Sequence, residues 1–550
     1  METLLTPLTL WKDFDSSLPV NEDVTEEYTH DGVLYKSVNF SGRQTENGRV
    51  CLGGVLASKD KTDSPVILYL QDKLDKDINY EVSNHFVNLG FRVFIFNYLS
   101  FPWQKAITTY TEDSILGDIN VSGDSLYNII GDVKKTAWYE WICSAKYALT
   151  YLKTLSNEKI GVLGEGTGSI LSLLLNGCDN RVDAVASING FGWLTLKGVD
   201  KYAEESTAEV DMDDKTLAFT SGMETQSYVP LAKAPNLIIA SSHNVEQDSD
   251  RAHDTVLRFN KDVPTYFNLS LGYNDLIGEE SLNDLDLFFQ KYLQDKDFYA
   301  SKITDVTLQK DDYTLTIKVG LPVEKVKSVD VYVAECNENR IKRNFLKAQS
   351  VGEDDKGKRI FKFDSFSSSI PLMAFAKVTF ESGFTVSSRY YVLEGESGKA
   401  KDKKPCKVLY DSLMGINGFF TISSTSKTVK GRGEPKTALG PFNIEGMLCD
   451  KGIKTYKVGS SHFRAEDNSL LLFSVNSSEF LKLKITADAN KMEKYVCELS
   501  INAGKVWQSI SLEAKNFKRK DGMPLSSFKD IYCLRMEGSV SFILSNISWV

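Results

Sequence analysis

The chain has 550 residues, which is too long for one hydrophobic core, because single domains seldom exceed about 250 residues. Apolar residues make up 42% of it and charged residues 25%, a composition that is typical of folded proteins and excludes global disorder. The formal net charge of -10 argues against a nucleic-acid partner, since phosphate backbones require a concentrated basic surface.

The N-terminus and the cysteines indicate the compartment in which the protein is found. No run of apolar residues is long enough for a membrane span, and residues 1–23 lack the basic leader and apolar core of a secretory signal. The eight cysteines are spread singly, without the spacing of metal knuckles or disulfide scaffolds. We therefore expect reduced thiols, a cytoplasmic location, no metal site and no cofactor.

From residue 66 the sequence alternates between strand and helix patterns, which is typical of a mainly parallel sheet with helices on both faces. Apolar side chains recur at helical spacing from Trp138 to Leu152, so one stripe of that helix should pack on the sheet. The predicted strands are 66–70, 91–99, 159–164, 182–188, 236–242 and 265–271, and the predicted helices are 138–152, 169–175 and 282–293. These elements assign residues 1–300 to an α/β domain.

Beyond residue 300 the apolar pattern changes to alternation, as in β-strands. Asp311 and Asp312 separate two alternating runs, which predicts a hairpin, and further runs predict a small sandwich of immunoglobulin or fibronectin type over 301–394. The polar, lysine-rich segment 395–405 is the expected linker. Short strands between 406 and 550 predict a second, larger β-sandwich of jelly-roll type.

The turn at residues 164–168, GEGTG, joins a predicted strand to a predicted helix. A strand, a tight turn and a helix in this order hold the nucleophile of an α/β-hydrolase, in the pattern G-x-S-x-G. Gly164 and Gly168 provide the small flanking residues, with Glu165 and Thr167 beside the apex. The apex itself is Gly166, so we expect the turn to be present and its nucleophilic hydroxyl to be absent.

The chain resembles the dienelactone-hydrolase and acetyl-xylan-esterase-like branch of the α/β-hydrolases over about residues 10–295. Three segments carry the resemblance: GFRVFIFNYLS (90–100), TAWYEWICSAKYALTYL (136–152) and IGVLGEGTGS (160–169). The predicted fold class is therefore α/β, an α/β-hydrolase-like, mainly parallel sheet domain followed by two all-β sandwich domains. The resemblance implies a catalytic acid after the strand at 236–242 and a histidine after the strand at 265–271.

The segment after residue 242 offers Glu246, Asp248 and Asp250 for the acid position, whereas Asn274 or Asp275 stands where the histidine would be. None of the five histidines lies between the last predicted strand of this domain and residue 300, and an amide cannot accept the hydroxyl proton. We therefore expect a pseudoenzyme with a binding or scaffolding role, toward a glycan or a small ester or anion.

Three alternatives stay open at the turn, and the second and third keep it non-catalytic. In the first, Thr167 or Ser169 attacks and His243 or His253 supplies the base, which would make the chain an active carboxylic-ester hydrolase of the carbohydrate acetyl esterase type. In the second, the backbone N–H groups of Gly166 and Thr167 bind a carboxylate or phosphate at the start of the helix. In the third, the turn serves packing alone.

The C-terminal part, particularly 526–550, resembles the last strands of a carbohydrate-binding or galactose-binding-like jelly roll. The resemblance implies exposed aromatic platforms, for which Trp507, Tyr456 and Phe463 are the candidates, although aromatic residues on alternating strands are usually core. Trp549 we interpret as core. The sequence identifies no partner; a carbohydrate or another small molecule fits these features, and residues 406–550 are either an independent binding module or a structural appendage.

Overall fold

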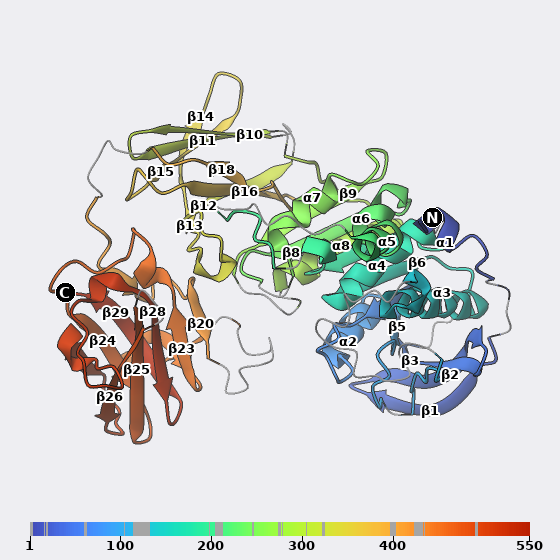
Figure 1. Cartoon of the computed structure of the whole chain (residues 1–550), viewed down its shortest axis with the longest axis horizontal. Helices are drawn as coiled ribbons and strands as arrows, with labels where there is room; N and C mark the ends of the chain where they lie inside the picture. The colour runs from blue at the N-terminus through green and yellow to red at the C-terminus, as the bar shows by residue number, and fades with distance from the viewer. Residues whose placement is uncertain are drawn as a thin grey trace.

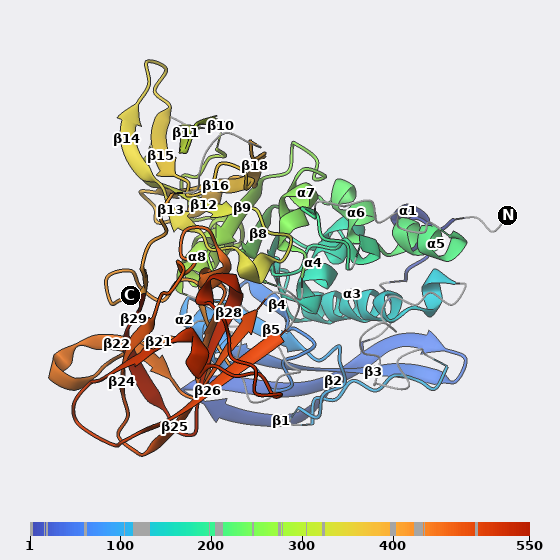
Figure 2. The same ribbon diagram turned by 60° about the vertical axis from the view of Figure 1, so that its left-hand side comes forward.

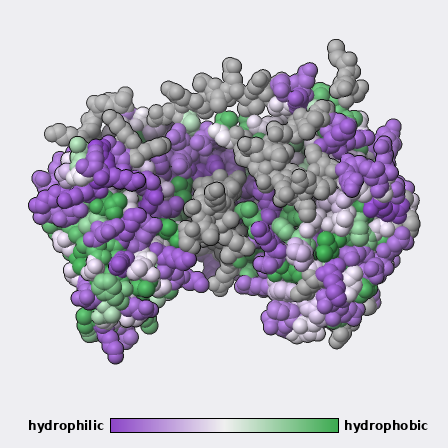
Figure 3. Space-filling view, turned by 60° about the horizontal axis from the view of Figure 1, so that its bottom comes forward, coloured by the Kyte–Doolittle hydropathy of each residue, from purple (hydrophilic) through white to green (hydrophobic). Residues whose placement is uncertain are grey.

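The computed structural model describes residues 4–15, 17, 20–59, 63–103, 105–113, 132–196, 198–203, 213–244, 247–272, 277, 279–303, 305–321, 325–396, 403–422, 433, 435–489 and 493–550. Three parts follow one another along the chain. The first domain lies at the right of Figure 1, a middle sandwich at the top and a C-terminal sandwich at the left. Seen from below, the surface is hollowed between the C-terminal sandwich and the first domain (Figure 3).

The first domain is built on one nine-stranded sheet, in the order β1-β2-β3-β5-β4-β6-β7-β8-β9. Its first three strands are antiparallel, and β4 to β9 run parallel to one another. The strands are β1 Asp23–His30, β2 Val33–Thr45, β3 Gly48–Ser58, β4 Val66–Leu70, β5 Arg92–Phe96, β6 Ile160–Glu165, β7 Ala184–Ile188, β8 Asn236–Ser241 and β9 Thr265–Ser270.

Helices cover both faces of this sheet, as the pleat of β4 illustrates. Val66 and Leu68 pack into the core beneath α3 and α4, whereas Ile67 and Tyr69 pack into the opposite core beneath α2 and α8. Both sets are fully or almost fully buried, as expected for a central parallel strand. The α-helices are α1 Pro7–Leu10, α2 Tyr80–Asn88, α3 Ala137–Leu155, α4 Thr167–Cys178, α5 Asp214–Gly222, α6 Thr225–Tyr228, α7 Ala252–Val256 and α8 Glu279–Gln294.

Helix α3 is buried more widely than its sequence pattern predicts. Apart from Tyr139, every residue from Ala137 to Leu152 is buried, so burial is not confined to one stripe. The N-terminal segment supplies an outer cover, in which Trp11 stacks on Tyr139 at 5.0 Å and Phe14 packs against Tyr147. A segment distant in sequence thus covers the face that periodicity assigned to solvent.

The middle sandwich consists of two antiparallel sheets. They share one core with α8 and the adjacent face of the first domain, so the predicted boundary at residue 300 crosses a continuous apolar cluster. The hairpin predicted at Asp311–Asp312 is confirmed, because Asp311 pairs with Thr314. The strands are β10 Asp305–Asp311, β11 Thr314–Gly320, β12 Val326–Glu335, β13 Leu346–Lys347, β14 Gln349–Glu353, β15 Arg359–Asp364, β16 Leu372–Phe380, β17 Thr385–Ser387 and β18 Tyr391–Leu393.

Polar contacts also join the middle sandwich to the first domain, beside β8 and β9 (Figure 2). The amide of Asn268 in β9 donates to the hydroxyl of Thr385 (2.6 Å), and the backbone N–H of Leu269 donates to Ser387 Oγ (2.9 Å). Strand β17 therefore lies directly against β9.

The C-terminal sandwich also has two antiparallel sheets, whose inner faces form one core. It contacts the middle sandwich: the N–H of Ser461 donates to Glu335 (3.0 Å), and the amide of Asn417 donates to the carbonyl of Phe345 (2.8 Å). Its strands are β19 Val408–Tyr410, β20 Phe419–Thr421, β21 Lys436–Leu439, β22 Glu445–Cys449, β23 Gly452–Thr455, β24 Leu471–Asn476, β25 Leu481–Ala489, β26 Glu493–Ile501, β27 Gln508–Leu512, β28 Ile531–Gly538 and β29 Phe542–Trp549.

The predicted class, a mainly parallel sheet domain followed by two all-β sandwiches, is confirmed. The three strands before residue 66 were not predicted. The predicted linker at 395–405 is described only at its ends, where Glu396 and Lys403 donate backbone N–H groups to Ser368 and Phe366 of the middle sandwich. The predicted domain boundaries themselves stay predictions.

Candidate functional site

The turn between β6 and α4 has the sharp geometry of a nucleophile elbow. Gly166 lies at its apex with φ 52° and ψ -112°, a conformation that is strained for any residue with a Cβ atom. A Cβ atom on Gly164 would overlap the backbone of Gly168, and one on Gly168 would overlap the carbonyl of Leu70. Small residues are therefore required on both sides of the apex.

The turn also has the place in the sheet that an elbow requires. Strand β6 is in the parallel part of the sheet between β4 and β7, and α4 begins at Thr167, directly after the apex. The first domain has the α/β-hydrolase fold. By this order the acid of a hydrolase would follow β8 and its histidine would follow β9.

In this α/β-hydrolase domain a carboxylate lies where the nucleophile would project. A Cβ atom on Gly166 would overlap Oδ2 and Cγ of Asp72, in the loop after β4, and would lie 2.9 Å from Oδ1. Thr167 donates its backbone N–H (3.4 Å) and its hydroxyl (3.2 Å) to Asp72 Oδ1. That N–H forms half of the oxyanion hole in hydrolases of this fold. Asp72 thus lies in the space of both the nucleophile and the oxyanion.

The surroundings of Asp72 act on its ionisation in opposite directions. Burial raises the pKa of the Asp72 carboxyl, and the hydrogen bonds from Thr167 oppose that rise. The first turn of α4 adds the positive end of a helix dipole, which favours an anion. The group that occupies the turn is therefore a carboxylate of the chain itself, and burial outweighs the hydrogen bonds in setting its pKa.

The N–H of Gly166 and the side chain of Glu165 both form hydrogen bonds within the sheet. The backbone N–H of Gly166 donates to the carbonyl of Ile188 (2.8 Å), so the expectation that it faces a ligand was wrong: this N–H belongs to the sheet. Glu165 is buried and accepts a hydrogen bond from the hydroxyl of Tyr69 in β4. Burial, followed by the Glu165 carboxylate, raises the pKa of Tyr69 well above its usual value.

Ser169, the alternative nucleophile, and the alternative bases His243 and His253 are each engaged in contacts of their own. Ser169 is fully buried and donates its hydroxyl to the carbonyl of Gly190 (2.6 Å). His243 lies between Ser242 and the carbonyl of Arg343, and His253 meets the ring of Phe267 edge-on. Burial lowers the pKa of each histidine to about 4. Within the described residues, neither Ser169 nor Thr167 hydrogen-bonds to a histidine.

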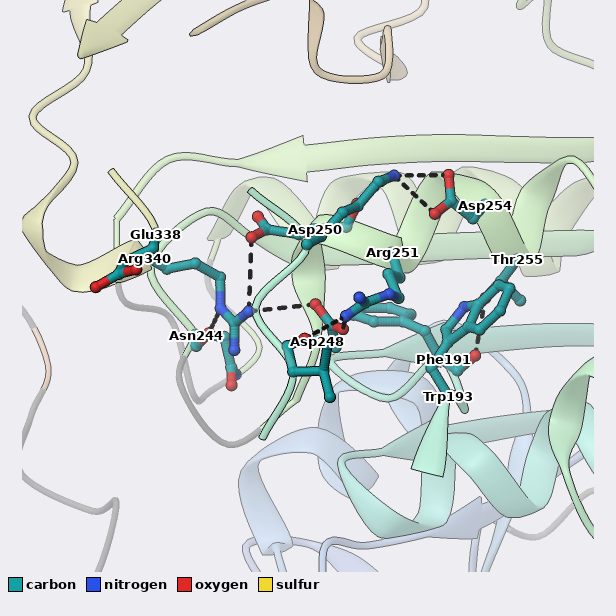
Figure 4. A network of polar contacts seen from close by, with 12 residues as sticks. Phe191, Trp193, Asn244, Asp248, Asp250, Arg251, Asp254, Thr255, Glu338 and Arg340 are labelled. Atoms are coloured by element: carbon teal, nitrogen blue, oxygen red, sulfur yellow. Dashed lines mark hydrogen bonds and ion pairs between the residues drawn. The ribbon is translucent and has the colours of Figure 1, made fainter. Parts of the chain in front are cut away.

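The acid loop after β8 is tied to the middle sandwich. Asp250 has no exposed side chain and forms a bidentate pair with Arg343, with Nη1···Oδ1 2.5 Å and Nη2···Oδ2 2.8 Å. Asp248 pairs with Arg251 and with Arg340 (3.2 Å), and Figure 4 shows Arg340 reaching toward both aspartates. Arg340 begins a short 3-10 helix, Arg340–Lys342. Both described acid candidates thus neutralise arginines of another domain.

Three of the predicted site residues, Glu246, Asn274 and Asp275, lie outside the described residues. Asp72 was missed by the sequence interpretation. Its signal was available: it is an acidic residue in the loop after a buried strand, and the corresponding loop of α/β-hydrolases completes the oxyanion hole.

The three predicted aromatic platforms differ in exposure. Phe463 is fully buried in the C-terminal core and cannot present a face to a sugar, which corrects its assignment. Tyr456 is half-buried and belongs to a small cluster with Ile341, Phe420 and Leu74, contributed by all three parts of the chain. Trp507 is half-buried and donates its indole N–H to the carbonyl of Pro441 (3.0 Å). Trp549 is core, as predicted.

In the described part of the chain, no three His, Cys, Asp or Glu side chains are grouped so that they could hold a metal ion. No helix among the described residues is long and apolar enough to cross a membrane.

No family model matches the chain, and no curated protein matches its sequence. Among solved structures, acetyl xylan esterase 1 from Thermoanaerobacterium is similar at 12% identity over 52% of this chain and 92% of the esterase, with a TM-score of 0.39. An acetyl xylan esterase from Paenibacillus has 12% identity over 52% and 94%, with a TM-score of 0.42. Dienelactone hydrolase from Anabaena variabilis has 14% identity over 49% and 98%, with a TM-score of 0.31. The fold assignment rests on the strand order and the turn.

Proposed function

We propose that this chain is a non-catalytic α/β-hydrolase-fold protein with a binding or scaffolding role. One observation carries the proposal: the apex of the turn is Gly166, and the space beside it holds the carboxylate of Asp72 on the Thr167 N–H. A serine hydrolase needs a hydroxyl at the apex and a free N–H for the oxyanion. Both needs are unmet in the arrangement described.

The acid loop supports the same proposal. A catalytic aspartate orients a histidine and compensates its developing charge. Asp250 instead neutralises the charge of Arg343, whose side chain is completely buried. Asp248 neutralises the charges of Arg251 and Arg340. Releasing Asp250 for catalysis would leave the buried Arg343 without its carboxylate, and releasing Asp248 would remove one of the two carboxylates beside Arg340.

The test is hydrolysis of p-nitrophenyl acetate by the purified full chain. We expect no turnover above the uncatalysed background rate measured without protein, and the same result for Asp77→Asn, a control that alters an exposed aspartate of the same loop. The variants Ser169→Ala and Asp72→Asn should also leave that background unchanged.

A turnover well above background that Ser169→Ala or Asp72→Asn abolishes would contradict the proposal. It would establish the alternative, a carboxylic-ester hydrolase of the carbohydrate acetyl esterase type with a rearranged site. Loss in Ser169→Ala would identify a hydroxyl nucleophile, whereas loss in Asp72→Asn alone would identify a carboxylate that acts as nucleophile or base.

The partner and the compartment belong to the proposal. A carbohydrate or another small molecule stays the proposed partner, with the half-buried Trp507 and Tyr456 of the C-terminal sandwich as the candidate platforms. The eight cysteines are free thiols, which supports a reducing compartment such as the cytoplasm.

A further inference from the structure

Two adjoining hollows lie between the first domain and the middle sandwich, and together we name them the seam pocket. They share His253 and Phe267 of the first domain and Arg389 and Tyr391 of the middle sandwich. The inner hollow has a volume of about 310 Å³ and the outer one about 580 Å³. Sites for small molecules usually have volumes of about 300–1,000 Å³. The seam pocket is therefore large enough for such a ligand.

The inner hollow is lined by three buried polar atoms that have no hydrogen-bond partner among the described residues: Ser249 Oγ, His253 Nδ1 and the hydroxyl of Tyr390. Ser249 is only 2% exposed and Tyr390 only 9%. Buried polar groups almost always have a partner, so three unpartnered groups in one hollow indicate a place where a ligand or water completes the bonds.

The carboxylates around the inner hollow are neutralised by neighbouring basic side chains. The two carboxylates on its wall are already paired, Asp250 with Arg343 and Asp254 with Lys201 (2.7 Å). Burial lowers the pKa of His253 to about 4, so its ring is neutral near pH 7 and can donate or accept one hydrogen bond at Nδ1. This end of the pocket therefore suits an uncharged hydroxyl or carbonyl group.

The outer hollow is basic and partly apolar. Its described lining contains Lys261, Lys302 and Arg389 and no carboxylate, and none of the three cations has an ion pair within the described part of the chain. The walls between them are apolar, including Phe259 and Ile303. In a chain with a net charge of -10, three unpaired cations around one opening create a local site for an anion.

We propose that the seam pocket binds a small organic anion with a ring or other apolar body, whose carboxylate or phosphate meets the basic rim and whose hydroxyl or carbonyl enters the inner hollow. This site shares no residue with the turn at Gly166 and does not depend on whether the first domain is catalytic. Because two domains supply its walls, an occupant stabilises them together.

Four probes separate the two ends of the pocket in calorimetric titrations of the full chain. 4-Hydroxycinnamate has both the hydroxyl and the carboxylate, cinnamate lacks the hydroxyl, and 4-hydroxycinnamyl alcohol lacks the charge. We expect 4-hydroxycinnamate to bind about fivefold more tightly than cinnamate, which loses one hydrogen bond in the inner hollow. We expect the same difference from 4-hydroxycinnamyl alcohol, which loses the attraction to the basic rim. 4-Nitrophenyl phosphate tests phosphate in place of carboxylate, and binding of either anion supports the pocket and identifies the headgroup that it accepts.

Two variants assign the binding to the pocket. Tyr390→Phe removes the hydroxyl that has no partner among the described residues but keeps the ring. It should weaken the binding of 4-hydroxycinnamate about fivefold and leave the binding of cinnamate unchanged. Its control is Tyr410→Phe, which removes another buried, unpartnered hydroxyl, in the C-terminal sandwich. Arg389→Gln should weaken the binding of both carboxylate probes, 4-hydroxycinnamate and cinnamate, most strongly at low salt. Lys356→Gln, an exposed control in the same domain, should leave their binding unchanged.

Failure of 4-hydroxycinnamate and of 4-nitrophenyl phosphate to bind would overturn the proposal. So would binding that neither Tyr390→Phe nor Arg389→Gln changes relative to its control. Neither outcome bears on hydrolysis at the turn, so this proposal and the proposed function can fail separately.

Discussion

The turn at Gly166 and the loop after β8 are two parts of the site that an active α/β-hydrolase would use together, and here they differ in what holds them. The turn is completed within the first domain, by Asp72 from the neighbouring β-strand loop. The loop after β8 is completed from outside, by Arg340 and Arg343 of the middle sandwich.

The difference shows how a hydrolase fold can retain its geometry under two different constraints. The turn needs only small residues and a compact neighbour, so its backbone shape persists with a glycine at the apex. The acid loop carries charges that require partners once they are buried. Its shape therefore depends on the second domain, and the two regions should respond differently to substitution.

The largest effect is expected at the acid loop, in Arg343→Met. This change leaves the fully buried Asp250 without its bidentate partner, and breaking a buried pair in this way costs about 3–5 kcal/mol. The measurement is urea unfolding of the full chain. Arg519→Gln is the matched control, because it breaks the more exposed pairs with Asp521 and Glu493 and should cost far less.

The double variant Asp250→Asn, Arg343→Met decides whether the pair itself is responsible. It should be more stable than Arg343→Met alone, since the uncompensated carboxylate is gone. If the double variant is as unstable as the sum of the two single ones, the arginine acts through packing on Tyr202 and Tyr390 instead.

A smaller loss is expected at the turn, in Gly166→Ala. The new Cβ atom would overlap the Asp72 carboxylate at a positive φ, and we expect a loss of about 2–3 kcal/mol. Gly32→Ala is the control: Gly32 also has a positive φ, of 77°, but nothing lies within 4 Å of its Cβ position, so only the backbone cost of about 1 kcal/mol remains.

Adding Asp72→Ala to Gly166→Ala should recover the part of the loss that comes from the overlap. The turn should also stay inactive as a hydrolase: Gly166→Ser with Asp72→Ala should not hydrolyse p-nitrophenyl acetate, because neither described candidate base, His243 or His253, is held beside the turn. Rapid turnover by that variant would mean that a base outside the described residues serves the turn.

His243, in the acid loop, should make stability depend on pH. Its folded pKa of about 4 is below the usual 6.5, so the stability that its neutral form contributes is complete above about pH 6.5 and is lost as the pH falls toward 4. Between about pH 7.5 and about pH 5 wild type should lose roughly 2 kcal/mol more than His243→Gln. His30→Gln, at a surface histidine, should follow wild type; equal losses in both variants would exclude His243 as the cause.

Much of the fold could be predicted from local sequence patterns. The buried parallel strands are continuous apolar runs such as 66–70, and the sandwich strands alternate, so their positions agree closely with the structure. Of the antiparallel strands at 23–58, β1 is largely exposed and has no clear apolar alternation, whereas β2 and β3 are largely buried and their apolar residues were overlooked. The wide burial of α3 was missed because it depends on Trp11 and Phe14, which no local period reveals.

The candidate site was only partly predictable, for a related reason. Gly166 is visible in the sequence because the turn is a local motif. The contact of Asp72 with that turn joins two parallel strands separated along the chain by β5 and α3, and the pairing of Asp250 with Arg343 joins two domains. Both depend on tertiary packing, and a single sequence contains no periodic signal for either.

The smallest effect that still separates the two regions concerns Asp72 and pH. Its folded pKa is raised above the usual 3.8 by burial, so its contribution to stability is most favourable at low pH and is lost as the pH rises through the folded pKa. Asn at this position stays neutral, and Asp72→Asn should therefore gain stability relative to wild type as the pH rises. Urea unfolding of both proteins, at pH values from below the usual 3.8 to above the folded pKa, measures this difference in stability. Asp77→Asn is the exposed control, and its stability relative to wild type should not change with pH. This is opposite in sign to the His243 effect, in which wild type loses stability on acidification. If the advantage of Asp72→Asn instead shrank as the pH rose, the Thr167 hydrogen bonds and the start of α4 would outweigh burial, and the carboxylate would be a stabilising anion in the turn.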